Sequence, residues 1–181
     1  MAERERRGAG PSVMLVPEGD SRPRRVCLEC GFVHYRNPLV VVGAVCEHGG
    51  RVLMCRRAIA PRQGFWTIPA GYLELDELPE AGARREALEE ARARIEIDRL
   101  LAVYAITRIS QVQLIFAARL PDPEVASGPE SLEVALFDWD RIPWAELAFP
   151  SVRWALEHYR DQEATGDRTT RSNPPGETGD W

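Results

Sequence analysis

Three glutamates in one short segment carry the strongest chemical signal in this chain. Glu86, Glu89 and Glu90 are spaced i, i+3 and i+4, so on a helix their carboxylates share one face. Three like charges this close repel each other unless a cation lies among them. Mg²⁺ binds a few carboxylate oxygens, keeps several waters and takes its remaining ligands from substrate phosphates. The spacing therefore predicts a site for Mg²⁺ or Mn²⁺ and a phosphate-containing substrate.

The alternative is a solvated helix face, on which Arg85 and Glu89 form an ordinary i, i+4 ion pair. The wider spacing argues against it. Gly71 is followed after five residues by Glu77, and Arg85 and Glu86 follow after seven more. With the glutamate pair at 89–90, this resembles the Nudix box, G-x5-E-x7-R-E-U-x-E-E-x-G-U. By this resemblance the chain is identified as a member of the Nudix hydrolase superfamily, which implies an α/β fold, an α/β/α sandwich around a mixed sheet.

One position departs from the box. Arg92 stands where the box has its closing glycine. A residue other than glycine at a left-handed turn costs on the order of 1 kcal/mol, or else the helix continues further. The departure concerns the turn after the helix and leaves the predicted metal-binding face intact.

Composition places the chain among globular proteins. It has 181 residues, 44% of them hydrophobic, and a net charge of −5. No apolar run approaches the roughly 20 residues of a membrane span, and the N-terminus lacks the apolar core of a signal peptide. We therefore expect a cytoplasmic protein with no membrane partner. The negative charge argues against nucleic acid as a partner, because phosphate backbones are bound by basic surfaces.

Hydrophobic periodicity predicts one domain with flanking segments. Residues 1–12 are expected to be disordered, 13–37 to form a ribbon-like segment and 38–160 to form the hydrolase domain. Residues 161–181 are polar and rich in Gly, Pro, Ser and Thr, so a disordered tail is expected there. The elements predicted within the domain are strands at 39–47, 51–57, 66–70, 100–108, 111–120 and 134–139, and helices at 79–92 and 149–159.

Four cysteines divide into two kinds. Cys27 and Cys30 form a C-x2-C turn of the type that provides half of a zinc ribbon, whereas Cys46 and Cys55 lie inside predicted strands as buried thiols. A structural zinc needs four ligands, and even with His34 the count is short. Residues 16–38 resemble the second half of the N-terminal ribbon in a Nudix subgroup that hydrolyses FAD and ADP-ribose, where another C-x2-C lies upstream. Its absence here predicts that zinc is not bound.

The subgroup resemblance extends over residues 16–160 and implies roles for further residues. The carbonyl of Ala70, just before Gly71, is expected to reach the metal, and Arg85 to orient a helix glutamate. A glutamate outside the helix often assists, and Glu133 or Glu130 is the candidate. The residues expected to be catalytic are therefore Glu86, Glu89, Glu90 and Arg85.

Substrate-binding candidates lie between the hairpin and the box. Arg57 or Arg62 could clamp phosphate, since the chain has no lysine, and Phe65 or Trp66 could stack on a ring. For the two aromatic residues, packing in the core is an equally good explanation.

The resemblance implies metal-dependent hydrolysis of the diphosphate bond in a nucleoside diphosphate linked to another group. FAD and ADP-ribose are favoured, which would give AMP plus FMN or ribose 5-phosphate. NADH is an alternative, although the chain lacks the S-Q-P-W-P-F-P-x-S signature of NADH pyrophosphatases. An alternative of another class is a non-catalytic nucleotide sensor on the same fold. The oligomeric state is left open between a monomer and a homodimer.

Overall fold

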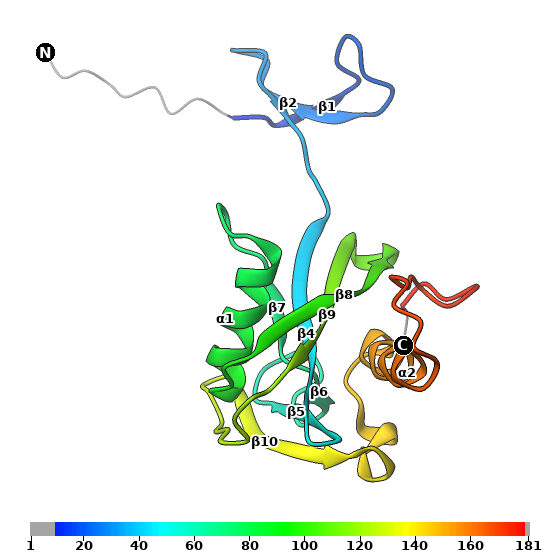
Figure 1. Ribbon diagram of the computed structural model, residues 1–181. Helices are drawn as coiled ribbons and strands as arrows, with labels where there is room; N and C mark the ends of the chain where they lie inside the picture. Colours follow the sequence, from blue (N-terminus) through cyan, green and yellow to red (C-terminus); the bar gives the residue numbers. More distant parts are fainter. Residues whose placement is uncertain (1–9, 180–181) are drawn as a thin grey trace, which may run out of the picture. The chain divides into compact units, whose positions relative to one another are not determined.

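The computed structural model describes residues 10–179, in two compact units divided after Asn37. Most of the predicted disordered N-terminus, residues 1–12, lies outside the described residues. Each unit has its own sheet (Figure 1).

The first unit is a small antiparallel sheet in the order β1-β2-β3. Its strands are β1 (Val13–Leu15), β2 (Arg24–Val26) and β3 (Val33–His34). Between β2 and β3 the chain turns at the two cysteines: the Gly31 N–H donates to the Cys27 carbonyl at 2.8 Å, and the Cys27 N–H donates to the Phe32 carbonyl at 2.9 Å. The predicted ribbon-like segment is therefore a strand-and-turn unit.

The second unit contains a mixed seven-stranded sheet. Five of its strands follow the order β10-β5-β4-β9-β8, and the other two, β6 and β7, pair with β5 and β4. Strands β4 and β9 run parallel, and the other pairs are antiparallel. The strands are β4 (Leu39–His48), β5 (Arg51–Arg57), β6 (Trp66–Thr67), β7 (Ala70–Tyr72), β8 (Glu96–Ile106), β9 (Gln111–Arg119) and β10 (Ser131–Asp138).

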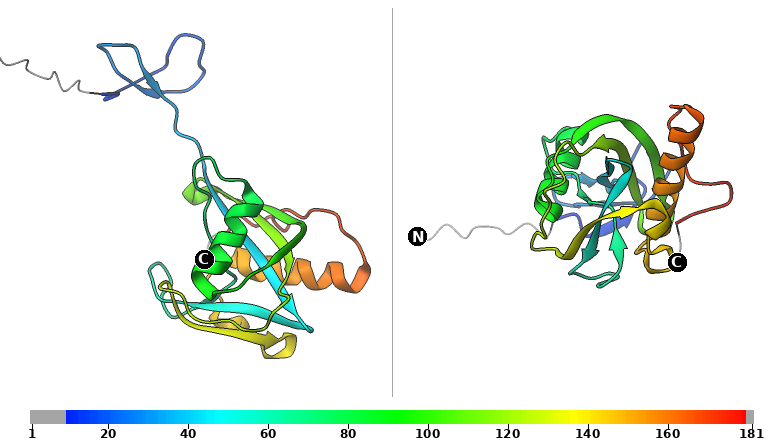
Figure 2. Two further views of the ribbon diagram at one scale, coloured as in Figure 1. Left: turned by 60° about the vertical axis from the view of Figure 1, so that its left-hand side comes forward. Right: turned by 60° about the horizontal axis from the view of Figure 1, so that its bottom comes forward.

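Two helices cover opposite faces of this sheet, α1 (Pro79–Ala91) and α2 (Pro150–Thr165) (Figures 1 and 2). Short 3₁₀ helices occupy Thr107–Ile109, Trp139–Arg141 and Trp144–Glu146. Strand β4 shows why there are two cores: Val42, Ala44 and Cys46 pack on the α1 side, and Val45 packs on the α2 side. A strand buried on both faces reads as a continuous apolar run. The expected α/β/α sandwich is confirmed.

The predicted strand at 66–70 is divided in two by the structure. Trp66 and Thr67 pair with β5, whereas Ala70 pairs with Gly43 of β4. Pro69 lies between the two pairings and has no N–H to donate to a ladder, so the strand changes partner there. As a result, Ala70 and Gly71 lie on β7, beside the helix that carries the glutamates.

The structure also differs from the predicted disorder after residue 160. Helix α2 continues to Thr165, and the following residues hydrogen-bond to β8. Composition underrates this segment because its order comes from hydrogen bonds to strand and helix partners. Burial of apolar surface, which composition does record, contributes little there.

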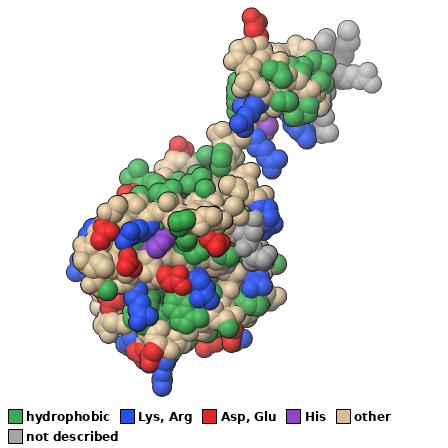
Figure 3. All heavy atoms as spheres, turned by 90° about the vertical axis from the view of Figure 1, so that its right-hand side faces the viewer, with side chains coloured by type: hydrophobic (Ala, Val, Ile, Leu, Met, Phe, Trp, Pro, Cys, Tyr) green, Lys and Arg blue, Asp and Glu red, His purple; other side chains and the backbone are tan. Residues whose placement is uncertain are grey.

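The outer surface of the second unit carries charges of both signs. On the face shown in Figure 3, arginine side chains are interspersed with acidic and neutral ones. Among residues 10–179, no helix is both long and apolar enough to cross a membrane.

Candidate active site

Helix α1 holds the predicted metal-binding face against the sheet. Ala83, Ala87 and Ala91 are fully buried on its inner side, so the helix approaches β4 closely. Glu86 and Glu90 lie next to this alanine stripe and are only 8% and 6% exposed. Two of the three glutamates are therefore carboxylates buried against the sheet, which contradicts a fully solvated helix face.

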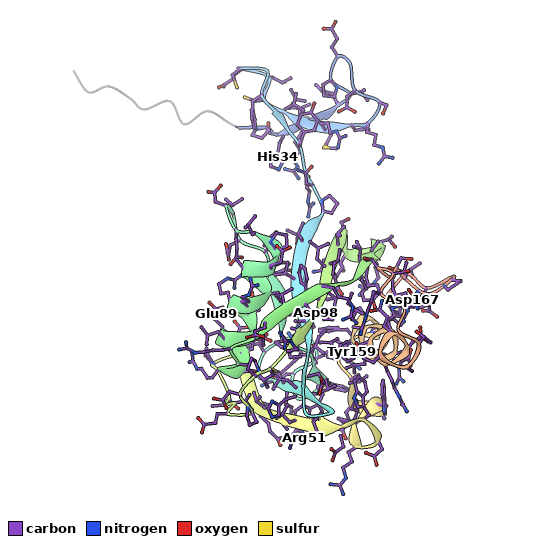
Figure 4. The ribbon with its side chains drawn as sticks, viewed as in Figure 1. His34, Arg51, Glu89, Asp98, Tyr159 and Asp167 are labelled. Carbon is purple, nitrogen blue, oxygen red and sulfur yellow. The ribbon has the colours of Figure 1, made fainter. Side chains whose placement is uncertain are left out.

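The third glutamate, Glu89, is more exposed than the other two, and α1 ends shortly after it at Arg92. Glu89 is half exposed, with 55% of its side chain accessible, and projects from α1 as labelled in Figure 4. Arg92 takes the left-handed conformation at φ 55°, while its N–H donates to the Leu88 carbonyl and the Ala93 N–H donates to the Ala87 carbonyl. The helix thus ends where the box glycine would end it, at a conformational cost of about 1 kcal/mol.

Gly71 provides the space that Glu86 occupies. A Cβ atom on Gly71 would lie 2.3 Å from the Glu86 carboxyl carbon, closer than any real contact. The neighbouring residue binds the second buried acid, because the Ala70 N–H donates to Glu90 Oε2 at 3.1 Å. Strand β7 and helix α1 therefore form one cradle, with the two carboxylates held at the backbone of Ala70 and Gly71.

Arg85 connects the other acidic positions of the motif. It donates to both carboxylate oxygens of Glu77 at 2.9 Å, a bidentate pair. Its Nη1 atom also donates to Glu86 at 2.6 Å and to Glu89 at 3.2 Å. The guanidinium further donates to the Tyr72 carbonyl at 3.0 Å. Arg85 therefore contacts Glu86 and Glu89, two of the carboxylates predicted to bind metal, and ties them to the loop before the helix.

The electrostatics of the buried acids favour a bound cation. Burial raises the pKa of Glu90 to about 8, against the lowering effect of the Ala70 N–H and of Arg57. Burial also raises the pKa of Glu86, although Arg85 acts in the opposite direction. Glu130 raises both pKa values further. Because burial disfavours the ionised form of both carboxyl groups, a nearby positive charge would stabilise that form strongly.

The site residues line a cavity of about 710 Å³ in the second unit. Its lining includes all three helix glutamates, Ala70, Gly71, Arg57 and Glu130. This volume is within the usual range for small-molecule sites.

The donor set fits a hard divalent cation. Its members are carboxylates and the backbone beside Gly71, and the cradle leaves no room for a side chain other than Glu86. Within residues 10–179, no three acidic, histidine or cysteine side chains converge on one point, and Arg85 is ion-paired with both Glu86 and Glu89. Residues Glu86, Glu89 and Glu90 would hold the metal, with water and phosphate as its other ligands.

The structure separates the predicted substrate residues. Arg57 lines the cavity, and its guanidinium lies 5.2 Å from the centre of the Phe149 ring. Trp66, in contrast, is a core residue packed edge-on against Phe137 at 4.9 Å, so the stacking role predicted for it is wrong. Strand β6 places Trp66 in the core together with the α2 residues.

The assisting glutamate is also placed differently. Glu133 forms an ion pair with Arg56 at 3.6 Å and does not line the cavity, whereas Glu130 does. The loop before β10 explains this, because its Gly128 N–H donates to the Glu90 carbonyl at 2.9 Å and brings the loop to the end of α1. Of the two glutamates left open by the sequence, the structure favours Glu130.

The alternative clamp and stacking residues pair with each other. The Arg62 guanidinium lies 3.9 Å from the Phe65 ring centre, and its Nε donates to the Ala148 carbonyl at 3.1 Å. Neither lines the cavity. Sequence reasoning missed Phe149 and the two glutamines of β9, Gln111 and Gln113, which do. The i, i+2 spacing of these glutamines in a predicted strand was a usable signal, since it places both on one face.

The cysteine turn of the first unit does not fit a closed zinc site. Cys27 is buried and Cys30 exposed, and backbone N–H groups of Cys30 and Glu29 lower the pKa of the Cys27 thiol. That arrangement suits a thiolate, but within residues 10–179 no third cysteine, histidine or acid joins the pair. Cys46 and Cys55 are buried in the second unit, as predicted. The absence of bound zinc stays a prediction.

Comparison with known proteins matches both units. The NUDIX domain family model matches residues 36–160, and the zinc-ribbon model described as Nudix N-terminal matches residues 9–36. A NUDIX hydrolase from Nitrosomonas europaea, known from a crystal structure, is 43% identical with a TM-score of 0.86. The match covers 96% of this chain and 99% of that one.

Two curated relatives match over shorter stretches. The MutT-like protein of Streptomyces ambofaciens is 38% identical over 102 residues, 56% of this chain and 64% of that protein. The ADP-ribose pyrophosphatase of Methanocaldococcus jannaschii is 28% identical over 130 residues, 70% of this chain and 76% of that protein. The chain therefore spans slightly less than two thirds of the first relative and about three quarters of the second.

Proposed function

Because the chain belongs to the Nudix hydrolase family, we propose that it is a divalent-metal-dependent pyrophosphatase acting on a nucleoside diphosphate linked to a second group. ADP-ribose is the first substrate to test, with AMP and ribose 5-phosphate as products. Support for this choice comes from the M. jannaschii relative, which carries the name ADP-ribose pyrophosphatase. FAD, which would give AMP and FMN, and NADH are the alternatives within the same reaction class.

The observation that carries this proposal is the pair of buried carboxylates, Glu86 and Glu90, in the wall of a cavity. Burying an acid is unfavourable unless its charge is compensated, so such a pair is retained where a cation binds. Half-exposed Glu89 lies one turn from Glu86 and lines the same cavity. A nucleotide sensor has no need of this arrangement, which therefore favours the enzyme.

The residues of the cavity divide the work of hydrolysis. A cation held by Glu86, Glu89 and Glu90 would supply positive charge to the diphosphate and would lower the pKa of a water. Arg57, at the end of β5, can bind a phosphate oxygen, since arginine suits phosphate recognition. Glu130 is the acid outside α1 that faces Glu86 and Glu90, and it can accept a proton from the attacking water. Arg85 positions Glu86 and Glu89 by its hydrogen bonds.

The test is a substrate panel with full-length protein. ADP-ribose, FAD, NADH, diadenosine polyphosphates and 8-oxo-dGTP are incubated with Mg²⁺ or Mn²⁺, and the products are separated by chromatography. We expect ADP-ribose to be cleaved to AMP and ribose 5-phosphate, with loss of activity when EDTA is added. Carrying out the reaction in H₂¹⁸O identifies the attacked phosphorus, because the label enters only one product.

A matched variant separates enzyme from sensor. Glu130→Gln keeps the size and hydrogen-bonding capacity of the side chain but removes the proton acceptor. Reduced turnover with unchanged AMP binding supports the enzyme. Tight nucleotide binding without hydrolysis of any panel member, in wild type and variant alike, would favour the sensor and refute the proposal.

A further inference from the structure

The segment after α2 is bound to the edge of the sheet. The Arg171 N–H donates to the Leu101 carbonyl and the Val103 N–H donates to the Arg171 carbonyl, both at 2.9 Å, so Arg171 pairs with β8 as a strand residue would. Two residues on, the Asn173 amide accepts from the Ala105 N–H and donates to the Ala105 carbonyl, again at 2.9 Å. The Asn173 side chain thus replaces a peptide group and continues the ladder along an edge strand.

Helix α2 holds the other side of this segment through a buried amide. Gln162 is 0% exposed, and its Nε2 donates to the Thr169 carbonyl at 2.7 Å. Its carbonyl oxygen accepts from Arg99 at 3.0 and 2.9 Å. The Arg171 side chain is also bound to Asp161 at 2.7 Å. Release of the segment would leave the Gln162 Nε2 group buried without its acceptor, which is unfavourable. The segment is therefore fixed in place.

The path along β8 brings the segment to the candidate active site. Gly179 is buried and lines the same cavity as Glu86 and Glu90. It adopts φ +82°, and a Cβ atom there would lie 2.5 Å from Ile106 Cδ1. The backbone conformation favours glycine at this position, and a Cβ atom there would force the Ile106 side chain to shift. The C-terminal segment therefore contributes Gly179 to the cavity wall.

The chemistry of this part of the wall differs from that of the glutamate cradle. All of its lining residues are uncharged, whereas the charged lining residues come from α1, β5 and the loops beside β7 and β10. The uncharged set, contributed by β8, β9, the 3₁₀ turn between them and the C-terminal segment, is Ile106, Ile109, Gln111, Gln113, Ile115 and Gly179.

The two glutamines provide the polar part of this uncharged end. Gln113 Nε2 donates to the side-chain oxygen Oε1 of Gln111 at 2.8 Å, which fixes both amides. Gln111 can then donate its own N–H groups and Gln113 can accept with its oxygen. Flanking isoleucines with a fixed donor and acceptor suit a flat, uncharged ring with a hydrogen-bonding edge, as in a nucleobase. A sugar with several hydroxyls would need more polar partners than this end offers.

Resting on the proposed function, we propose that the C-terminal segment, residues 169–179, is a fixed wall of the substrate cavity that positions the nucleoside part of the substrate. Bond cleavage takes place at the glutamate cradle, so the segment acts on binding rather than on the chemical step. Loss of the wall raises KM and leaves kcat nearly unchanged.

The test uses two point variants and a deletion. Asn173→Ala removes both hydrogen bonds to Ala105, and Gly179→Ala introduces the Cβ that would collide with Ile106. We expect each to raise KM for ADP-ribose about tenfold while kcat stays within about twofold. Ser172→Ala, an exposed neighbour, is the matched control and is expected to behave as wild type. Deleting residues 169–181 removes the whole C-terminal segment and leaves the β8 and β9 residues of the uncharged end in place.

Equilibrium binding separates this inference from the proposed function. Binding of AMP and of ribose 5-phosphate, measured by calorimetry without metal, requires no turnover. We expect the variants to bind AMP more weakly than wild type does and ribose 5-phosphate equally well. That result supports the wall even if no panel member is hydrolysed, in which case only the proposed function fails.

Trypsin cleavage after Arg168 and Arg171 reports whether the segment has been released. Unchanged AMP binding and KM in a variant whose segment is cleaved rapidly would overturn the inference. A deletion that lowers KM would overturn it as well, because the segment would then obstruct the cavity. If the variants bind ribose 5-phosphate more weakly and AMP as well as wild type does, the assignment of the nucleobase to the uncharged end is contradicted.

Discussion

The two sides of the cavity are built in different ways. The cradle side comes from one helix and one short strand, and its carboxylates are held within a few residues of each other by Arg85 and Gly71. The opposite side is assembled from β8, β9 and a segment about seventy residues further along the chain. Figure 4 shows Glu89 on α1 and Asp167 beyond α2.

The two sides also differ in what stabilises them. Burial raises the pKa of Glu86 and Glu90, so ionising these two acids in the cradle costs stability. The wall opposite is uncharged and is held by hydrogen bonds between backbone groups, Asn173 and the buried Gln162. A charged local motif suits the reaction, whereas an assembled neutral surface suits substrate choice. Variants on each side should therefore affect different kinetic constants.

The largest effect is expected at the cradle. Glu89→Gln and Glu90→Gln each remove a charge from the metal-binding face, so we expect kcat to fall by about 100-fold or more. The fold should be preserved, because the amide oxygen introduced by Glu90→Gln can still accept from the Ala70 N–H and one of three crowded charges is relieved. Turnover is measured at saturating Mg²⁺ and unfolding by urea titration. Near-normal rates in both variants would show that these glutamates are not the metal ligands.

A smaller loss should follow from Gly71→Ala. The new Cβ would displace the Glu86 carboxyl, which lies 2.3 Å from the Cβ position, and we expect kcat to fall about tenfold through misplacement of that ligand. Leu75→Ala, in the loop that follows β7 and 93% exposed, is the control and should leave the rate unchanged. A Gly71→Ala enzyme as active as the control would mean that Glu86 need not occupy this position.

On the opposite side, stability rather than turnover should change. Gln162→Ala leaves the Thr169 carbonyl without its donor and removes one of the acceptors of Arg99, which costs about 1–3 kcal/mol in free energy of unfolding. The exposed neighbour Arg160→Ala should cost less than about 0.5 kcal/mol. Urea unfolding of both variants checks the difference. Equal stabilities would show that the C-terminal segment is not held by this amide.

The smallest effect is expected in the first unit, where neither a complete motif nor a second set of partners is present among the described residues. Changing Cys27 and Cys30 together to serine should shift the melting temperature by no more than a modest packing loss, since two ligands cannot close a tetrahedral site. Metal analysis of the wild-type protein should find less than one zinc per chain. Stoichiometric zinc, lost together with the fold on chelation, would require ligands from elsewhere.

Local patterns in the sequence determined the cradle. The spacing of Glu86, Glu89 and Glu90 determines a shared helix face, because helical geometry depends only on sequence separation. Gly71 and Arg85 were identified by the same motif, and their contacts with Glu86 agree with it. Hydrophobic runs likewise indicated the main strands and both helices, since burial on a strand or helix follows a fixed period.

Tertiary structure alone decided which residues join the three glutamates in lining the cavity. Glu130 rather than Glu133 lies there because the loop before β10 binds the end of α1, and Trp66 is in the core because the chain changes strand partner at Pro69. The C-terminal segment was misjudged for the same reason. Composition records how much apolar surface a segment can bury, but the hydrogen bonds that order residues 169–179 depend on partners from β8 and α2, which only the fold brings together.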